Sequence, residues 1–169
     1  MPNGSPDIAA ASRRFDFVQH VHSYLSQSIA TADVKGNLLL VVAFGVAAVL
    51  ATTYHDNRDL FAKAAGRRYL LAAAVLALTW AVMWLLVAAW PRLGQAGRSH
   101  IYFDHLRQRE TADEMHRELS SLDDDGLIRE LTAHNFALAG IAAKKFSATR
   151  LAVIGLAVGL GAALGVYFF

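Results

Sequence analysis

Three uncharged apolar runs constrain this chain more than any other feature. They cover residues 38–54, 69–90 and 151–169. An α-helix needs about 20 consecutive apolar residues to cross a hydrocarbon layer about 30 Å thick. The second and third runs meet that length, and the first meets it when the polar turn before residue 38 is included. We therefore predict an all-α membrane protein with three transmembrane helices, with a buried core helix as the alternative for each run.

Composition favours a bilayer over a soluble core. The chain is 55% hydrophobic and 18% charged, whereas a soluble domain is about 45–50% apolar and about 25% charged. Its polar start places the first apolar run too late for a cleaved signal peptide, so we expect that run to remain in the membrane. The sequence contains no Cys, which excludes disulfides, thiolate catalysis and zinc–thiolate sites.

The distribution of Lys and Arg predicts the orientation of the chain. Three spans put the N-terminal segment and residues 91–150 on one side of the membrane, and residues 55–68 and the C-terminus on the other. Seven basic residues lie near span ends on the first side and four on the second. Since cytoplasmic loops carry the excess of Lys and Arg, we expect a cytoplasmic N-terminus.

These considerations divide the chain into seven segments. We expect a disordered N-terminus over residues 1–14, an amphipathic cytoplasmic helix over 15–37, a periplasmic loop over 55–68 and a cytoplasmic helical sensor segment over 91–150, besides the three spans. The apolar stripe of the amphipathic helix consists of Val18, Val21, Leu25, Ile29 and Ala32.

Residues 91–150 are predicted to form a helical hairpin. Apolar side chains recur at steps of three and four over about 99–122 and again over about 126–146. Between them stands Asp123-Asp124-Asp125-Gly126, whose carboxylates suit the N-terminus of the second helix. That helix has no breaker before the third span. The segment holds nine basic and nine acidic residues, which argues against a nucleic-acid surface.

Asp33, Lys35 and Asn37 stand directly before the first apolar run. One interpretation is an interfacial anchor, in which Lys35 snorkels to lipid phosphates. The other is a collar that gates a ligand pocket, because a carboxylate works against attraction to anionic lipid and is better explained by pairing with a cation. Three cations are proposed as partners of Asp33: Lys144, Lys145 and Arg150.

The segment IATADVKGNLLLVVAFGVAAVL resembles the membrane-proximal signature of the Pycsar transmembrane effector family. The matching positions are Ala32, Asp33, Lys35, Gly36 and Leu38–Leu40. The order of later parts is also similar: a second span ending in Trp90-Pro91-Arg92-Leu93, a helical segment containing YFDHL, and Lys144-Lys145-Phe146 before the last span. The resemblance covers about residues 15–169. Lys35-Gly36 and Lys145-Phe146 depart from the expected Lys-Ala and Lys-Tyr.

The resemblance implies a bacterial antiphage effector of the inner membrane. In such systems a pyrimidine cyclase makes cyclic UMP or cyclic CMP upon infection, and the effector senses the nucleotide and impairs the membrane, so that the infected cell dies by abortive infection. The effector itself catalyses nothing and needs no cofactor. The implied partners are the cyclic pyrimidine mononucleotide, the lipid bilayer and, functionally, the cyclase.

Ligand contacts are inferred from chemistry, because the resemblance supplies none. A cyclic nucleotide requires cations or amides for its phosphate, an aromatic ring for its base and polar groups for its ribose. Six candidates offer these groups: Tyr102, Arg107, His134, Asn135, Lys144 and Lys145. Each is also compatible with an ordinary surface or packing role.

The residues themselves indicate no catalytic or metal site. The sequence lacks a P-loop, a GxGxxG and an HExxH motif. His20 and His22 would point in nearly opposite directions on a helix, which disfavours chelation. The three consecutive Asp residues are better explained as a helix cap.

Small residues mark the third span as a packing helix. Gly155, Gly159, Gly161 and Gly165 form two small-x-x-x-small pairs on two faces, and such pairs let helices approach closely in lipid. They serve either packing against the other spans or self-association into a homo-oligomer. Two further functions stay open: a holin-like membrane toxin without a nucleotide sensor, and a small membrane regulatory subunit that docks a protein partner.

Overall fold

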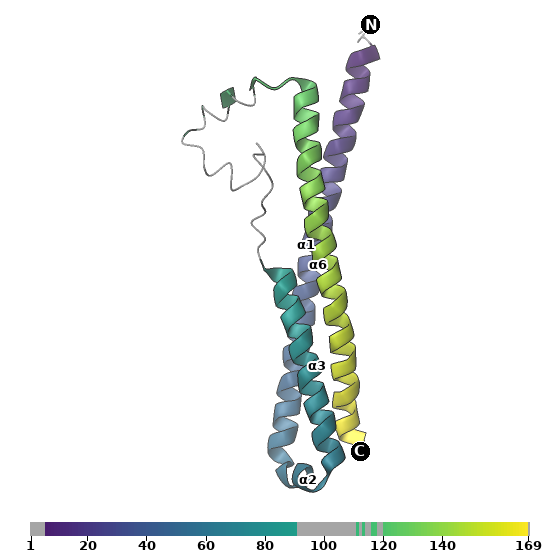
Figure 1. Ribbon diagram of the computed structural model, residues 1–169, viewed down its shortest axis with the longest axis vertical. Coiled ribbons are helices and arrows are strands. Elements are labelled where there is room, and N and C mark those ends of the chain that lie inside the picture. The colour runs from purple at the N-terminus through teal and green to yellow at the C-terminus, as the bar shows by residue number, and fades with distance from the viewer. Residues whose placement is uncertain (1–5, 91–110, 112, 114–115, 118–119, 169) are drawn as a thin grey trace. The chain divides into compact units, whose positions relative to one another are not determined.

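The computed structural model describes residues 6–90, 111, 113, 116–117 and 120–168, and it is helical throughout its regular structure. Within these residues four helices follow one another (Figure 1): α1 (Pro6–Asp56), α2 (Arg58–Lys63), α3 (Ala65–Ala89) and α6 (Asp124–Phe168). The predicted all-α class is confirmed for this part of the chain.

In the part of the chain that the structure describes, three helices are long and apolar enough to cross a membrane. They are α3, α6 and the part of α1 from Ser12 onward, and each carries one of the three apolar runs. Many large apolar side chains along these runs point outward: Val41 and Leu76 are each 71% exposed and Phe44 is 61% exposed. Exposed apolar surface on this scale is unusual for a soluble protein. We therefore interpret the three runs as lipid-facing helices rather than as buried core helices.

The chain divides into two compact units. Unit 1 consists of Met1–Ile29 with Pro91–Ala143, and unit 2 of Ala30–Trp90 with Lys144–Phe169. The boundary falls inside α1 and inside α6, so each of these helices contributes to both units.

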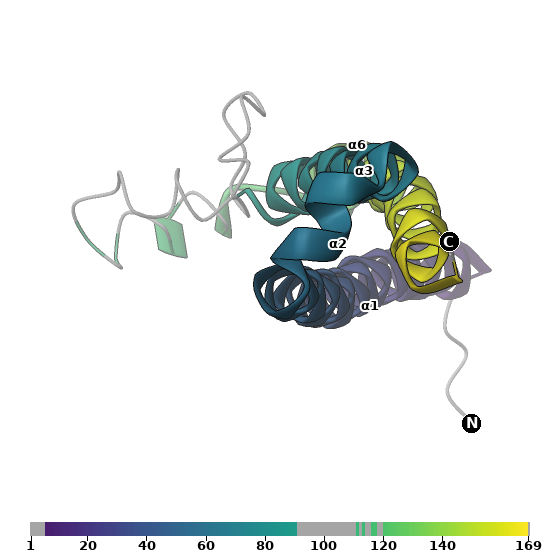
Figure 2. The ribbon, with the colours of Figure 1, turned by 90° about the horizontal axis from the view of Figure 1, so that it is seen from below.

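Unit 2 is a bundle of three helices with a small-residue core. Figure 2 shows α1, α3 and α6 side by side, with α2 bridging the ends of α1 and α3. Its buried centre contains Ala43, Ala74 and Ala81 beside Leu50, Leu78, Leu156 and Ala163. Alanine lets helix backbones approach closely, which is how helices gain van der Waals contact in lipid.

The residues expected to form a periplasmic loop include a short helix. Asn57 interrupts the helical ladder after α1, and its side-chain amide donates to the Thr53 carbonyl at 3.0 Å. Helix α2 then ends at Lys63, and the backbone of Ala64, which follows it, is extended (φ −109°, ψ 99°). Phe61 is 2% exposed and its ring lies 5.4 Å from that of Tyr54. This aromatic contact holds α2 against the end of α1.

Helix boundaries elsewhere extend beyond the expected ones. Helix α1 begins at Pro6, whereas the sequence predicts disorder through residue 14 and a separate helix from residue 15. The expected amphipathic stripe, by contrast, is less exposed than its surroundings from Val18 through Ala32. A single α1 results because no breaker separates the amphipathic segment from the apolar run.

The hairpin is described only in its second half. Most of its expected first helix, over 99–122, lies outside the described residues. Helix α6 begins at Asp124 and continues without a break through the third apolar run. Before it, the Asp123 carboxylate accepts a hydrogen bond from the Gly126 amide at 2.8 Å, which confirms the predicted capping role of this acidic turn.

Candidate functional site

An ion pair joins α1 to α6 within unit 2. The Lys145 ammonium donates a hydrogen bond to the Asp33 carboxylate. The Lys145 side chain is 13% exposed, and that of Asp33 is 45% exposed. Close to them in sequence, Ala32 is 4% and Ala148 is 2% exposed. These small buried residues let the two helices come close enough for a short side chain such as Asp to reach its partner.

The other proposed collar residues are placed differently. Lys35 and Asn37 are exposed on α1, as are Lys144 and Arg150 on α6. Helical phase explains the difference, because Lys145 turns toward α1 whereas Lys144, one position earlier, is rotated by about 100° at 3.6 residues per turn. Of the three cations proposed as partners for Asp33, the structure selects Lys145.

A second polar cluster joins α1 to α6 within unit 1. Asn135 is 6% exposed and is the buried polar residue among those described. Its amide nitrogen donates to the Val18 carbonyl at 2.9 Å. Its amide oxygen lies 3.2 Å from His22 Nδ1, which acts as donor when the proton is on that nitrogen. The amide nitrogen and the amide oxygen of Asn135 thus both contact groups of α1.

His134 lies beside this cluster. Its ring centroid is 5.3 Å from that of His22, with the ring planes tilted by 36°. Burial lowers the pKa of His134 below its usual 6.5, repulsion by His22 lowers it further, and Glu130 opposes the shift. The surroundings of His134 therefore favour its neutral form.

The six candidate ligand residues fall into three groups. Tyr102 and Arg107 lie outside the described residues. His134 and Asn135 come together in unit 1, where the contacts of Asn135 favour a role in joining helices. Lys144 and Lys145 belong to unit 2, where Lys145 is engaged by Asp33 and Lys144 is exposed.

The four glycines of the third span have unequal surroundings. A Cβ at Gly155 would meet Trp80 Cδ1 at 2.8 Å and the Ala77 carbonyl at 3.1 Å. At Gly159 it would meet Leu78 Cγ at 3.0 Å, and at Gly165 it would meet Leu70 at 3.3 Å. Gly161 has nothing within 4 Å. Three glycines therefore serve packing against α3, and Gly161 is open.

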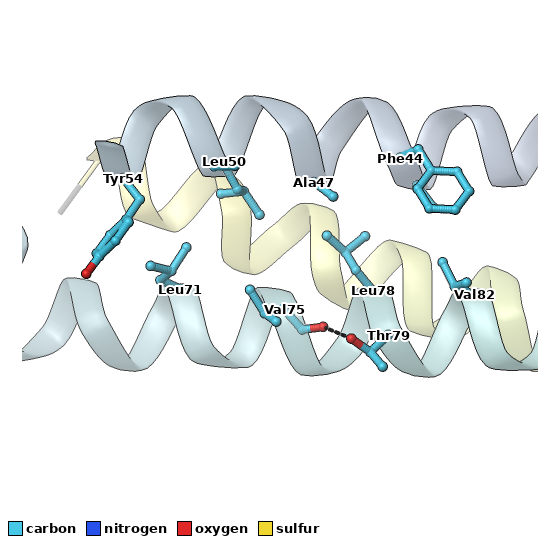
Figure 3. Close-up of a pocket in the computed structure, with 11 residues that line it drawn as sticks. Phe44, Ala47, Leu50, Tyr54, Leu71, Val75, Leu78, Thr79 and Val82 are labelled. Atoms are coloured by element: carbon cyan, nitrogen blue, oxygen red, sulfur yellow. Dashed lines mark hydrogen bonds between the residues drawn. The ribbon is translucent and has the colours of Figure 1, made fainter. Parts of the chain in front are cut away.

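Unit 2 also carries two apolar grooves along α1. One, of about 400 Å³, lies between α1 and α3 and includes Phe44, Leu50 and Val75 in its lining. Figure 3 shows these side chains facing one another from the two helices. The other, of about 370 Å³, lies between α1 and α6 and includes Gly45. Their linings suit lipid chains or apolar helix surfaces rather than a nucleotide.

Sequence reasoning missed a charged cleft in unit 1. It has a volume of about 490 Å³ and is lined by Arg13, Arg14, Phe17, Val18 and Ile128. Both arginines fall in the segment that is expected from sequence to be disordered, and such a segment offers no fixed surface for a ligand. The sequence does contain a signal for this cleft. Arg14, Val18 and His22 follow one another at steps of four, and residues at this spacing share a helix face.

The described part of the chain contains no group of three or more His, Cys, Asp or Glu residues that could hold a metal ion.

These features define the class of protein as a helical membrane protein. Its described part contains three apolar helices, two of which, α1 and α6, also contain a polar segment. A family model for the Pycsar effector protein domain matches residues 17–169, and the chain belongs to this family. Pycsar effectors are antiphage membrane effectors that work with a cyclase signal and are generally not enzymes. Searches of curated proteins and of solved structures find no match.

Proposed function

We propose that this chain is a gated effector of the bacterial inner membrane that senses cyclic UMP or cyclic CMP. In the resting state its membrane helices are held together, and nucleotide binding on the cytoplasmic side shifts them to a state that impairs the membrane. The observation that carries the proposal is the Asp33–Lys145 ion pair. It supplies a polar, breakable contact between α1 and α6 at the end of two apolar segments.

The ion pair is suited to gating because it is weakly held. The Asp33 side chain is 45% exposed, although that of Lys145 is only 13% exposed, so water reaches the pair from the carboxylate side. Ion pairs that water screens contribute about 0.2–1 kcal/mol. A ligand shifts an equilibrium only by the difference in its affinity for the two states. A nucleotide whose affinity differs modestly between the resting and the membrane-active state is therefore enough to break this ion pair. It acts either by binding Lys144 and Lys145 directly or by changing the contact between α1 and α6.

Self-association is part of the proposal. The open face at Gly161 is available to a neighbouring copy, since α3 does not cover it. Small residues on a lipid-facing surface allow close contact between helices, with model pairs worth about 1–2 kcal/mol. We infer that a homo-oligomer forms through this face and that nucleotide binding alters its membrane-active state.

The test is membrane depolarisation in bacterial cells that express the full chain together with a pyrimidine cyclase. An inactive cyclase variant is the matched control, since it leaves expression of the effector unchanged. Depolarisation that requires active cyclase supports the proposal. Depolarisation of equal extent with the inactive cyclase would instead support a holin-like toxin, and no depolarisation in either case would support a regulatory subunit.

A further inference from the structure

The charged cleft of unit 1 combines the groups that a small phosphate-containing ligand needs. Arg13 and Arg14 are exposed on α1, and Phe17 presents a ring that is 66% exposed. Val18 and, from α6, Ile128 complete the lining. Asp16 lies among these residues in sequence but is not part of the lining, so among the described residues both charges that line the cleft are positive.

Each group matches a part of a cyclic mononucleotide. Arginine binds phosphate oxygens through its planar fork of N–H donors. Aromatic side chains stack on nucleobases regardless of base identity. A cleft of about 490 Å³ lies within the range of about 300–1,000 Å³ that is usual for small-molecule sites.

We propose that this cleft is the nucleotide-recognition site, in which Arg13 and Arg14 bind the phosphate and Phe17 stacks on the pyrimidine. The inference rests on the proposed function, because it takes the cyclic pyrimidine nucleotide as the ligand. Nucleotide recognition is then placed at the beginning of α1 rather than at Lys144 and Lys145.

The cleft is connected to the polar contacts that join α1 to α6 in unit 1. Val18 is one of the residues that line the cleft, and its carbonyl accepts the hydrogen bond from Asn135. Ile128 and Asn135 are seven residues apart on α6, which places them on the same helix face two turns apart. A ligand seated against Val18 and Ile128 thus contacts the same pair of helix faces that Asn135 and His22 hold together.

The experiment measures binding of cyclic UMP and cyclic CMP by calorimetry to the full chain in nanodiscs of neutral lipid. The test variants are Arg13→Gln with Arg14→Gln, and Phe17→Leu. The matched controls are Arg129→Gln and Phe15→Leu, which change an exposed Arg and an exposed Phe of unit 1 outside the cleft. Phe17→Tyr tests stacking, because it keeps an aromatic face.

We expect the double arginine variant to bind at least tenfold more weakly and Phe17→Leu on the order of tenfold more weakly, which corresponds to about 1.4 kcal/mol. The two controls and Phe17→Tyr should bind within about twofold of the wild type, a change of under about 0.5 kcal/mol. Circular dichroism of each variant establishes that its helix content is unchanged. Because the altered side chains are exposed, the helices should be retained.

The binding measurements also separate a failure of the cleft proposal from a failure of the proposed function. If the wild type binds a nucleotide and Lys144→Ala with Lys145→Ala abolishes binding while the cleft variants do not, recognition occurs at the lysines and the function stands. If the wild type binds neither nucleotide, both the cleft and the nucleotide-gated function are wrong.

Lipid headgroups are the other source of phosphate. Nanodiscs containing phosphatidylglycerol test this source directly. If the arginine variant reduces the association of phosphatidylglycerol with the protein but leaves nucleotide affinity intact, Arg13 and Arg14 are lipid contacts and the proposal is overturned. If it reduces nucleotide affinity in neutral nanodiscs, where no anionic lipid is present, the cleft is supported.

Discussion

Lys145 of α6 pairs with Asp33 of α1 across 112 residues of sequence. The pair is asymmetric, since the Lys145 side chain is largely buried whereas that of Asp33 is nearly half exposed. Removing Asp33 leaves a cation in a poorly solvated position, and removing Lys145 leaves a carboxylate that water can still reach. The two single substitutions should therefore differ in cost.

Asp33→Asn should raise nucleotide-independent depolarisation, because it removes the charge that holds Lys145. With a pair worth up to about 1 kcal/mol, the population of the membrane-active state should increase by up to about fivefold. Depolarisation in cells without cyclase measures this change. Lys35→Gln is the matched control, since Lys35 is an exposed charge two residues away.

The charge-swapped variant Asp33→Lys with Lys145→Asp separates pairing from local charge. It restores the ion pair in reverse, so depolarisation without nucleotide should return toward the wild-type level. If Asp33→Asn behaves as the wild type with and without nucleotide, the gating role of this pair is wrong and the interfacial-anchor interpretation stands.

Gly155→Leu and Gly161→Leu should have different effects, although the glycines are six positions apart on one helix. A leucine side chain in place of Gly155 would collide with Trp80 and the Ala77 carbonyl, so Gly155→Leu should destabilise the fold of unit 2. Gly161 has open space, so Gly161→Leu should leave the protomer folded and weaken self-association by about 1–2 kcal/mol. Thermal unfolding and crosslinking in membranes measure the two effects. Unchanged crosslinking of Gly161→Leu would exclude this face as an oligomer contact.

Asn135→Ala should loosen unit 1. The substitution leaves the Val18 carbonyl and His22 without the partner they have in the structure, and an unsatisfied buried polar group costs about 1–3 kcal/mol. Hydrogen exchange over residues 17–25 and 127–138 should become faster. Thr132→Ala is the control, because the Thr132 hydroxyl donates to the Ile128 carbonyl of its own helix. Equal exchange in the two variants would show that Asn135 does not join the helices.

The stability of unit 1 should fall in mildly acidic solution because of His134. Its pKa is lowered in the folded protein by burial and by His22, with Glu130 opposing. Above pH 6.5 His134 is neutral in both states; as the pH falls through 6.5 the unfolded chain takes up a proton first, and stability decreases until the folded pKa is passed.

Hydrogen exchange at about pH 7.5 and about pH 5.5, corrected for intrinsic rates, measures this loss against the ordinary histidine range. His134→Gln should remove part of the pH dependence of exchange in α6, whereas His20→Gln, at an exposed position of α1, should not. An unchanged pH dependence in His134→Gln would assign the effect to other groups.

Topology is predicted from the excess of Lys and Arg on the side of residues 91–150. A reporter that is active only in the periplasm should be active when fused after Phe169 and inactive when inserted near Asp124. The inverse pattern would remove the cytoplasmic sensor from the proposed function, because the nucleotide would then be on the wrong side of the membrane.

Much of the architecture follows from local sequence alone. The three apolar helices follow from run length, since about 20 residues without charge have few stable places other than a bilayer. The cap at Asp123 and the continuous α6 follow from the acidic turn and the absence of a breaker. The need of Asp33 for a cation, and the three cations within reach, also followed from residue type and position.

The tertiary structure decided the particular partners. Asp33 pairs with Lys145 rather than with Lys144. Gly161 is open whereas Gly159 is covered, and Asn135 bonds two groups of α1. Each of these outcomes depends on how helices distant in sequence are rotated against one another. Hydrophobic periodicity determines which face of a helix is buried, but it does not specify the partner residue opposite each position. The cleft at Arg13 and Arg14 was not predicted for the same reason, because it forms where α1 packs beside Ile128.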